Sequence, residues 1–346
     1  MSKIEWTDAV WNPVVGCSPV SSGCFRCYAA KEAIRLAGNP HPAVRSAYEG
    51  TSEMRGTGPG RRAVFTGVVR CLPERLEQPM RWRKPRRVFV NSMSDLFHPD
   101  VPFEFIDQVF AVMGITPQHT YQILTKRPER MAEYMTEWAS PGAIAAETGS
   151  GCDGNRSWPF IRPDDLAARW PLPNVWLGTS VEDQAAADER VPYLLSTPAA
   201  VRFLSCEPLL GAVFLDEWLL ESEPPHPPVV DGLHWIIVGG ESGPGARPCS
   251  VAWVRDLVDQ GRFAGVPTFV KQMGRWIAGD YNDGFSCLDR WLLSDGSIFV
   301  PPILGLHTHT RPQDAVAFSL GGKGGDPRWW PEELRVRQYP DSMVPA

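Results

Sequence analysis

A strand–helix rhythm opens with the stretch Arg87-Val88-Phe89-Val90-Asn91-Ser92, a β-branched and aromatic run that ends in polar residues. Apolar residues at helical spacing follow over 103–113. The same alternation continues along the chain and predicts strands at 121–125, 175–180, 201–205, 235–239 and 268–271, and helices at 128–138, 183–195 and 253–263. Strands that alternate with helices predict right-handed β-α-β units and a parallel sheet.

The number of these units favours an α/β protein built on a parallel (β/α) barrel, full or partial, because about 250 residues is typical of that fold. A doubly wound open sheet is the structural alternative. The barrel domain is expected over residues 1–275, with a Gly-, Pro- and Ala-rich loop insertion near 139–173. Residues 276–346 are rich in Trp, Gly and Pro and are expected to form an irregular extension packed on the barrel.

The 346 residues carry a net charge of −6, which excludes a protein that is basic throughout. The sequence shows no signal peptide at its start and no apolar stretch of membrane-spanning length. We therefore expect a cytoplasmic protein without a membrane partner, in a bacterial cytosol or that of a phage-infected host. Thiols stay reduced in such a compartment. Five scattered cysteines are interpreted as small core residues or inert thiols: Cys71, Cys152, Cys206, Cys249 and Cys287.

The other three cysteines, Cys17, Cys24 and Cys27, lie in one short loop before a helical pattern that starts at Tyr28. Four thiolates would close a structural zinc site, whereas three can hold a metal centre and leave one position open. An iron–sulfur cluster is held by cysteine thiolates in the same way. The amino end of the following helix would face an anionic cluster or ligand. The loop is therefore the candidate metal site.

Polar residues follow directly after the predicted strands. In a parallel barrel these carboxyl ends share one rim, where active sites are built. The predicted ring consists of Asp95, His98, Lys126, Arg127, Glu182, Glu207, Glu241 and Lys271. From this ring, Asp95, Lys126 and Glu207 are the catalytic candidates.

The run Gly239-Gly240-Glu241-Ser242-Gly243 is the most specific of the strand ends. Glycines let a ligand approach the backbone, and exposed N–H groups can bind a carboxylate or phosphate. A carboxylate at this position would accept hydrogen bonds from an ammonium group or from ribose hydroxyls. The cofactor-binding candidates are Ser92, Asp95, Gly239, Gly240 and Glu241.

A three-cysteine loop before the first helix of a (β/α) barrel resembles the radical S-adenosylmethionine superfamily, whose common pattern is C-x3-C-x2-C. This chain has C-x6-C-x2-C, and Cys24-Phe25-Arg26-Cys27-Tyr28 keeps the second half of that pattern. A second resemblance covers about residues 3–275 and points to an uncharacterised phage and bacterial family with a three-cysteine motif. It is carried by the runs 4–8, 11–13, 89–98, 123–128, 203–211 and 238–244.

The resemblance implies a radical S-adenosylmethionine-like barrel in which Cys17, Cys24 and Cys27 hold three irons of a [4Fe–4S] cluster. The fourth iron would bind S-adenosylmethionine, and an electron donor of the flavodoxin or ferredoxin type would reduce the cluster. A 5′-deoxyadenosyl radical would then abstract hydrogen from a substrate. The phage distribution of the family favours a nucleic acid or nucleobase as that substrate, while a small metabolite or a peptide stays open.

A basic cluster and the 14 tryptophans would suit phosphate contacts and base stacking. The cluster consists of Arg81, Arg83, Lys84, Arg86 and Arg87.

Three other interpretations stay open. A metal-free barrel hydrolase would use Glu207 and Glu241 as acid and nucleophile. A zinc-stabilised binding module would need a fourth ligand, such as Cys71 or His98. A thiol cluster that binds no metal is the third.

Overall fold

The computed structural model describes residues 4–149, 158–219, 232–279, 290–293, 298–299, 315–319 and 327–340. The chain divides into two compact units. The first unit comprises Met1–Thr179 and Glu189–Phe203, and the second comprises Ser180–Asp188 and Leu204–Ala346.

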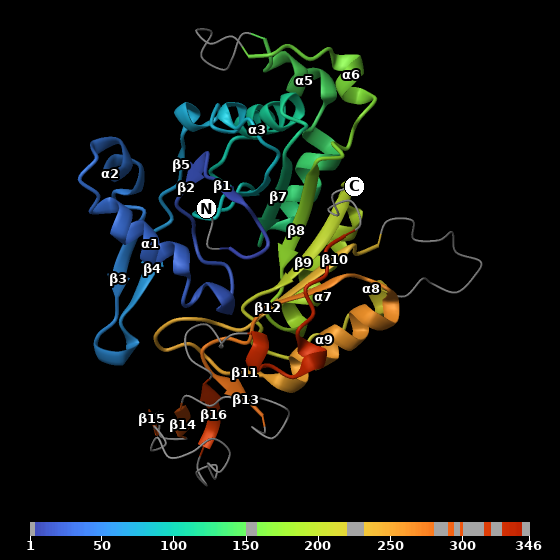
Figure 1. Ribbon diagram of the computed structural model, residues 1–346. Helices are drawn as coiled ribbons and strands as arrows, with labels where there is room; N and C mark the ends of the chain where they lie inside the picture. Colours follow the sequence, from blue (N-terminus) through green and yellow to red (C-terminus); the bar gives the residue numbers. More distant parts are fainter. Residues whose placement is uncertain are drawn as a thin grey trace. The chain divides into compact units, whose positions relative to one another are not determined.

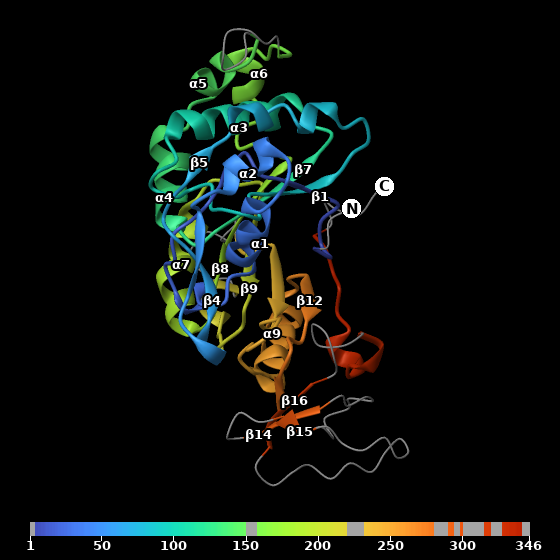
Figure 2. The same cartoon turned by 90° about the vertical axis from the view of Figure 1, so that its left-hand side faces the viewer.

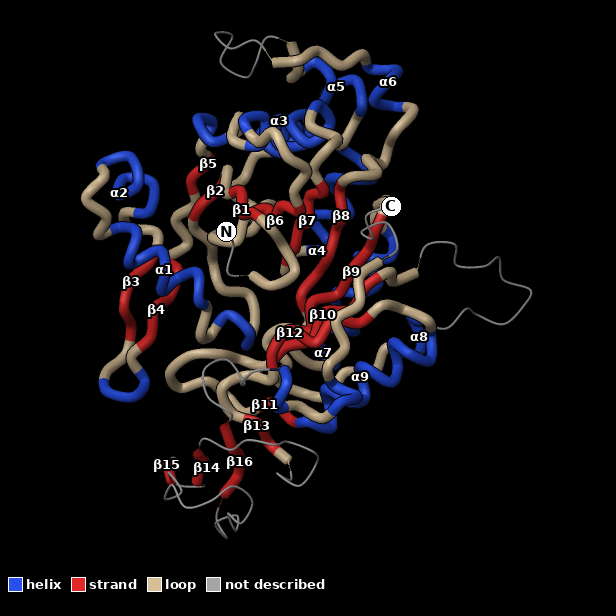
Figure 3. Tube along the Cα trace, viewed as in Figure 1, coloured by secondary structure: helices blue, strands red, loops and turns tan. Residues whose placement is uncertain are grey.

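The main sheet confirms the predicted α/β class and takes the form of a partial parallel barrel (Figure 1, Figure 3). Its strand order is β1 (Ala9–Trp11), β6 (Arg87–Val90), β7 (Thr120–Thr125), β8 (Val175–Ser180), β9 (Val201–Cys206), β10 (Trp235–Gly239) and β12 (Thr268–Gln272). Six of these strands match the sequence prediction to within two residues. The seventh, β1, was not predicted, because three residues are too few to show a period.

The stretch that opens the rhythm occupies an interior position of the sheet. Val88 of β6 pairs with Ala9 of β1 on one side and with Tyr121 of β7 on the other. Strands β8 and β9 are buried at every position. Continuous burial is expected of parallel strands that are covered on both faces, and it explains their unbroken apolar runs.

The helices of the first unit are α1 (Tyr28–Ala37), α2 (Pro42–Tyr48), α3 (Phe103–Ile115), α4 (Pro128–Glu133), α5 (Pro141–Ala146), α6 (Pro163–Ala167) and most of α7 (Gln184–Ser196). The helix predicted over 128–138 is α4 followed by one π-helical turn, Tyr134–Trp138. The segment 139–173, predicted as a loop, contains α5 and α6; Cys152 lies outside the described residues. Figure 2 shows α3 lying across the sheet of this unit.

Three further strand pairings complete the described part of the first unit. Strand β2 (Val14–Val15) pairs antiparallel with β5 (Arg70–Cys71), and β3 (Ser52–Arg55) pairs with β4 (Arg62–Phe65) as a hairpin. Gly16 forms an isolated parallel bridge with Ser94. Of these pairings, the Gly16–Ser94 bridge connects the segment that carries the cysteines to the turn after β6.

The second unit contains α8 (Asp216–Leu219) and α9 (Val251–Ala264). The predicted helix over 253–263 is therefore confirmed as α9. Residues 276–346, predicted as irregular, contain short strands of a five-stranded sheet. Its members are β11 (Cys249–Ser250), β13 (Ile277–Ala278), β16 (Ala315–Ser319), β14 (Arg290–Leu293) and β15 (Ile298–Phe299). These strands were not predicted, because their apolar runs are short and the sequence between them is rich in glycine and proline.

Seven of the 14 tryptophans are buried in the part of the chain that the structure describes. Trp6, Trp11, Trp176, Trp235 and Trp330 are among the largest fully buried side chains. Cys206 and Cys249 are also buried, as their isolated positions suggested. None of the described helices has both the length and the apolarity needed to cross a membrane.

Candidate functional site

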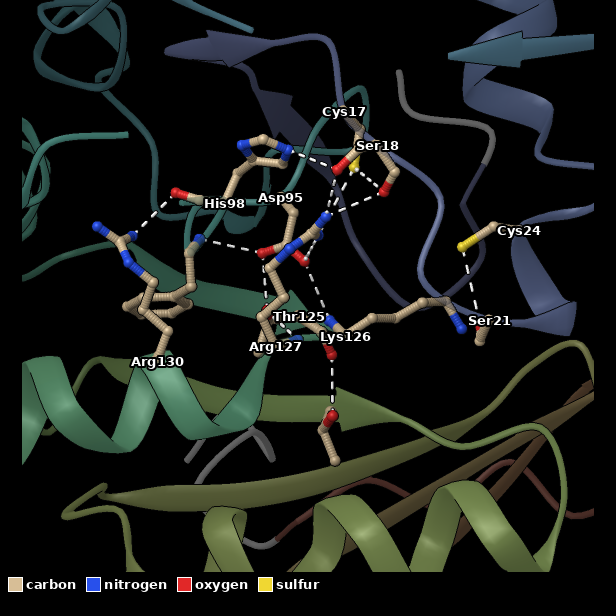
Figure 4. A network of polar contacts seen from close by, with 12 residues as sticks. Cys17, Ser18, Ser21, Cys24, Asp95, His98, Thr125, Lys126, Arg127 and Arg130 are labelled. Carbon is tan, nitrogen blue, oxygen red and sulfur yellow. Dashed lines mark hydrogen bonds and ion pairs between the residues drawn. The ribbon is translucent and has the colours of Figure 1, made fainter. Parts of the chain in front are cut away.

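Asp95 is the centre of a polar network at the carboxyl ends of β6 and β7 (Figure 4). Its Oδ1 accepts hydrogen bonds from Thr125 Oγ1 at 2.7 Å and from the Phe97 backbone N–H at 3.0 Å. Its Oδ2 accepts from the Lys126 backbone N–H at 3.1 Å and from Arg127 Nη1 at 2.9 Å. Four donors therefore pair with both oxygens of this buried carboxylate and fix its orientation.

Arg127 connects that carboxylate to the three-cysteine loop. Its Nη2 donates to the carbonyl and to the hydroxyl of Ser18, both at 2.9 Å. Its Nη1 also lies 3.8 Å from Cys17 Sγ. Burial disfavours the charge, but Asp95 and Cys17 outweigh burial and raise the pKa of this guanidinium. Arg127 is therefore a permanent cation placed against a cysteine sulfur.

Cys17 and Cys27 lie against one apolar cluster, which includes Val15, Ala30 and Met93. Burial, and then the charge of Asp95, raise the pKa of the Cys17 thiol to about 12, although Arg127 acts in the opposite direction. Burial also raises the pKa of Cys27. Both thiols are thus protonated at neutral pH unless something stabilises their thiolates.

Cys27 occupies the N-cap position of α1. The backbone N–H groups of Ala29 and Ala30, and the charge of Lys126, oppose the effect of burial on its pKa. The third cysteine, Cys24, has its Sγ 3.9 Å from Ser21 Oγ. Figure 4 shows the side chains of Cys24 and Lys126 directed toward the same region beside Ser21.

Among the residues that the structure describes, no three His, Cys, Asp or Glu side chains are placed to hold a single metal ion. The thiolates of a cubane cluster each bind a different iron, so they do not need to converge on one point. The three cysteines are nevertheless close enough to influence one another. Cys27 raises the pKa of Cys17, and Cys24 raises that of Cys27.

His98 contacts the cysteine loop from the other side. Its Nε2 lies 2.8 Å from Ser18 Oγ, and its Nδ1 accepts the Asp100 backbone N–H at 3.1 Å. This arrangement assigns the proton of the neutral ring to Nε2. Burial, and then the charge of Arg127, lower the pKa of His98, so the ring is neutral at pH 7.

Ser92 lies between the turn after β6 and the start of α1. Its carbonyl accepts a hydrogen bond from the Tyr28 hydroxyl at 3.0 Å, and its own hydroxyl donates to Asn12 Oδ1 at 3.3 Å. The Gly16 backbone N–H donates to the Met93 carbonyl at 3.2 Å. The cysteine loop and the turn after β6 therefore form one connected structure.

The second unit holds the remaining predicted residues. Lys271 Nζ lies 2.9 Å from Glu207 Oε1 and 3.2 Å from its Oε2, which also accepts from Ser205 Oγ at 3.2 Å. A Cβ at Gly239 would lie 2.4 Å from Glu207 Oε1. Gly239 therefore makes room for the carboxylate of Glu207, the residue directly after β9.

Glu241 is buried and bound by Arg247. The carboxylate accepts from the Arg247 backbone N–H at 2.8 Å, from Nε at 3.1 Å and from Nη2 at 2.6 Å. A Cβ at Gly240 would lie 2.4 Å from the Met273 carbonyl oxygen. At both glycines, the space that a side chain would need is taken by protein atoms. Glu182 is buried in the same unit.

The predicted ring is thus distributed over two groups. Asp95, Lys126, Arg127 and His98 meet the cysteine loop in the first unit, while Glu207 with Lys271 and Glu241 with Arg247 form ion pairs in the second. Sequence reasoning did not find the roles of Ser18 and Tyr28. A serine directly after a cysteine carries no signal of its own, because its partner Arg127 lies 109 residues further along the chain.

The predicted basic cluster lies elsewhere on the first unit. Arg87 is the first residue of β6, at the strand end opposite to the turn that contacts the cysteines, and it pairs with Asp8 at 2.9 Å. Arg81 pairs with Glu77, and the Arg86 guanidinium lies 5.2 Å from the centre of the Trp82 ring. Part of this cluster is therefore used in local contacts.

The chain is thus an α/β protein that has a partial parallel barrel and a three-cysteine loop beside one end of the sheet. Residues 1–319 match the family described as a protein of unknown function, DUF5131, and the chain belongs to this family. No curated protein and no solved structure matches the chain.

Proposed function

We propose that this protein is a radical S-adenosylmethionine enzyme whose [4Fe–4S] cluster is held by Cys17, Cys24 and Cys27. One observation carries the proposal. The chain runs from β1 through the three-cysteine loop into α1, and the Gly16–Ser94 bridge joins this loop to the turn after β6. The loop therefore lies at the carboxyl end of a parallel strand, the end at which barrel enzymes build their sites.

The donor set fits a cluster that keeps one iron free of protein ligands. Three thiols are present, and two of them pack on the same apolar cluster, which would exclude water. Ligand cysteines must be deprotonated. Arg127 favours the thiolate of Cys17, and Lys126 with the first turn of α1 favours that of Cys27. Burial keeps these thiols protonated otherwise, so they would release protons when the cluster binds.

When the cluster and S-adenosylmethionine are bound, with an electron donor of the flavodoxin or ferredoxin type, they would supply reductive cleavage of S-adenosylmethionine and abstraction of a hydrogen atom from the substrate. The residues of the chain would position the cluster and the loop that holds it. Arg127 places a positive charge beside the Cys17 sulfur, and Asp95 holds its guanidinium in position. Ser92 keeps the turn after β6 attached to α1 through Tyr28.

Within the first unit, Asp95 and Lys126 are the catalytic candidates beside the cysteine loop, and Ser92 and Asp95 are the candidates for cofactor binding. The predicted catalytic role of Glu207 and the predicted cofactor contacts of Gly239, Gly240 and Glu241, which lie in the second unit, stay predictions. The hydrolase alternative is weaker, because Glu207 and Glu241 are each bound to a cation. The hydrolase alternative also leaves the three cysteines without a function.

Anaerobic reconstitution with iron and sulfide tests the proposal directly. The full chain is expected to retain iron and sulfide and to show visible absorption. With S-adenosylmethionine and dithionite it should release 5′-deoxyadenosine and methionine in equal amounts, measured by chromatography. The variant Cys24→Ser is expected to lose both the iron and the cleavage.

Cys71→Ser is the matched control, because Cys71 is a half-buried thiol of the same unit outside the three-cysteine loop. It should behave as the wild-type chain does. The proposal fails if the wild-type chain retains no iron, or if Cys24→Ser retains a full cluster and cleaves the cofactor. Tightly bound zinc that is insensitive to oxygen would favour the binding-module alternative instead.

A further inference from the structure

The segment from Cys17 to Cys71, the last residue of β5, has a charge opposite to that of the whole chain. Residues 17–71 contain eight Lys or Arg residues and three Glu, a net charge of +5, whereas the full chain carries −6. This segment includes the cysteine loop, α1, α2 and the β3–β4 hairpin. A local excess of positive charge in an acidic protein marks a surface for an anionic partner.

The β3–β4 hairpin concentrates part of this charge. Arg55 and Arg62 are direct cross-strand partners, and Arg61 precedes the second of them. Like charges directly opposite each other destabilise a strand pair. Glu53 lies beside Arg55 and offsets one of these charges. An anion placed along the hairpin would relieve the remaining repulsion.

The hairpin is also open to solvent. Glu53, Met54 and Arg55 of β3 are exposed, although successive side chains of a strand point to opposite faces. The hairpin contacts α1, and Figure 1 shows its two strands beside that helix. Both faces of β3 are thus accessible to a partner.

Two exposed aromatic side chains lie next to these arginines. Phe25, between Cys24 and Cys27, is 43% exposed, and Tyr28 is 60% exposed. The Arg62 guanidinium lies 3.8 Å from the centre of the Phe25 ring, and that of Arg26 lies 5.6 Å from it. The basic hairpin therefore contacts the loop that carries the ligand cysteines. Arginines combined with exposed aromatic rings are the features that bind single-stranded nucleic acids.

We propose that the β3–β4 hairpin and Phe25 form a docking surface for a single-stranded nucleic acid. Arg26, Arg55, Arg61 and Arg62 contact its phosphates, and a base stacks on the exposed part of the Phe25 ring. Only the chemistry that follows docking rests on the proposed function, in which the nucleic acid would be the substrate. Docking itself does not need the iron–sulfur cluster. The predicted cluster Arg81–Arg87 fits this task less well, because it lies at the opposite end of β6.

Fluorescence anisotropy with labelled single-stranded DNA and RNA of about 16 nucleotides tests the docking surface. The full chain, without reconstitution, is titrated at several salt concentrations. Four phosphate contacts predict a slope of log K against log salt of about −3, at roughly −0.7 per contact. The variant Arg55→Ala/Arg61→Ala/Arg62→Ala should reduce the slope by about 2 and weaken binding at least about tenfold at low salt. Phe25→Ala should weaken binding about tenfold and leave the slope unchanged.

The matched control is Arg83→Ala/Lys84→Ala/Arg86→Ala, which removes the same charge at the other end of β6 and should keep the wild-type slope. The lysine variant Arg55→Lys/Arg61→Lys/Arg62→Lys retains the charge and should retain the slope, so a loss caused by misfolding is distinguished from a loss of phosphate contacts. Absence of binding at low salt, or an equal loss in the control, overturns the proposal. The proposal is also overturned if the chain binds an acidic flavodoxin-type protein but does not bind the oligonucleotide. None of these three results changes the outcome of the cleavage assay for S-adenosylmethionine.

Discussion

Gln122 is a polar side chain in an apolar place. It lies in β7 between Phe89 of β6 and Trp176 of β8, and it is fully buried. Within the described residues, neither its amide oxygen nor its amide nitrogen has a hydrogen-bond partner. An unpaired buried amide costs about 1–3 kcal/mol. The residue therefore lowers stability unless a bound group pairs with it.

Replacing Gln122 by Met should raise the free energy of unfolding by about 1 kcal/mol, because Met has a similar shape and no amide to desolvate. Urea denaturation of the full chain measures this change. Gln272→Met is the comparison, since Gln272 donates to the Gly240 carbonyl at 2.8 Å and its loss should lower stability. A loss of stability in Gln122→Met would reveal that a water or a ligand pairs with the amide.

His119 links stability to pH. It is fully buried directly before β7, where its Nε2 lies 3.1 Å from the Pro79 carbonyl oxygen. Burial lowers its pKa below the ordinary 6.5, and Arg86 acts in the same direction. The unfolded chain therefore takes up the proton first as pH falls, and stability decreases from about pH 6.5 downward.

The expected slope for this single group is at most about 1.4 kcal/mol per pH unit. His119→Gln keeps a donor near Pro79 and removes the titration, so its unfolding free energy should fall less steeply between about pH 6.5 and 5. Urea denaturation at several pH values gives both slopes. Identical slopes would show that His119 does not titrate in this range.

At the scale of elements, the Asp95–Arg127 pair joins the ends of β6 and β7 to the cysteine loop. Their side chains are 7% and 11% exposed, respectively. The Asp8–Arg87 pair joins β1 to β6 with similar geometry, but its side chains are 46% and 32% exposed. Removing one partner of a buried pair leaves an uncompensated charge and costs about 3–5 kcal/mol. An exposed pair contributes only about 0–1 kcal/mol.

Asp95→Asn is therefore expected to lower the free energy of unfolding by roughly 3 kcal/mol or more, and Asp8→Asn by less than about 1 kcal/mol. Denaturation of the two variants under the same conditions checks this contrast. Because Arg127 would lose its anchor, Asp95→Asn should also retain less iron after reconstitution. Equal destabilisation by the two substitutions would contradict the assignment of Asp95 as the anchor of the cysteine loop.

The whole molecule shows which features local sequence can predict. Strands such as 175–180 were predictable because a buried parallel strand is a continuous apolar run. The short strand Ala9–Trp11 was not, although it leads into the cysteine loop. The contact of Arg127 with Ser18 joins residues 109 positions apart, which no local pattern encodes. The three cysteines were recognisable from their spacing, whereas their cationic surroundings required the fold.

Strand β12 is the final member of the main sheet, and Arg337 bridges to Phe269 of that strand. The Val270 backbone N–H donates to the Val336 carbonyl, and the Gln338 N–H donates to the Thr268 carbonyl, both at 2.9 Å. The segment 336–338 thus covers an edge that would otherwise pair with other chains.

Removing residues 335–346 should therefore lower the melting temperature and cause association, because the truncation uncovers the β12 edge and takes away Tyr339, whose ring centre lies 5.3 Å from that of Phe269. Thermal unfolding and light scattering measure the two effects. Tyr339→Ala should lower stability without association, since the backbone bonds of 336–338 remain, and Tyr339→Phe should change little because it keeps the ring. A truncated chain that stays monomeric and as stable as the wild type would show that β12 does not need this cover.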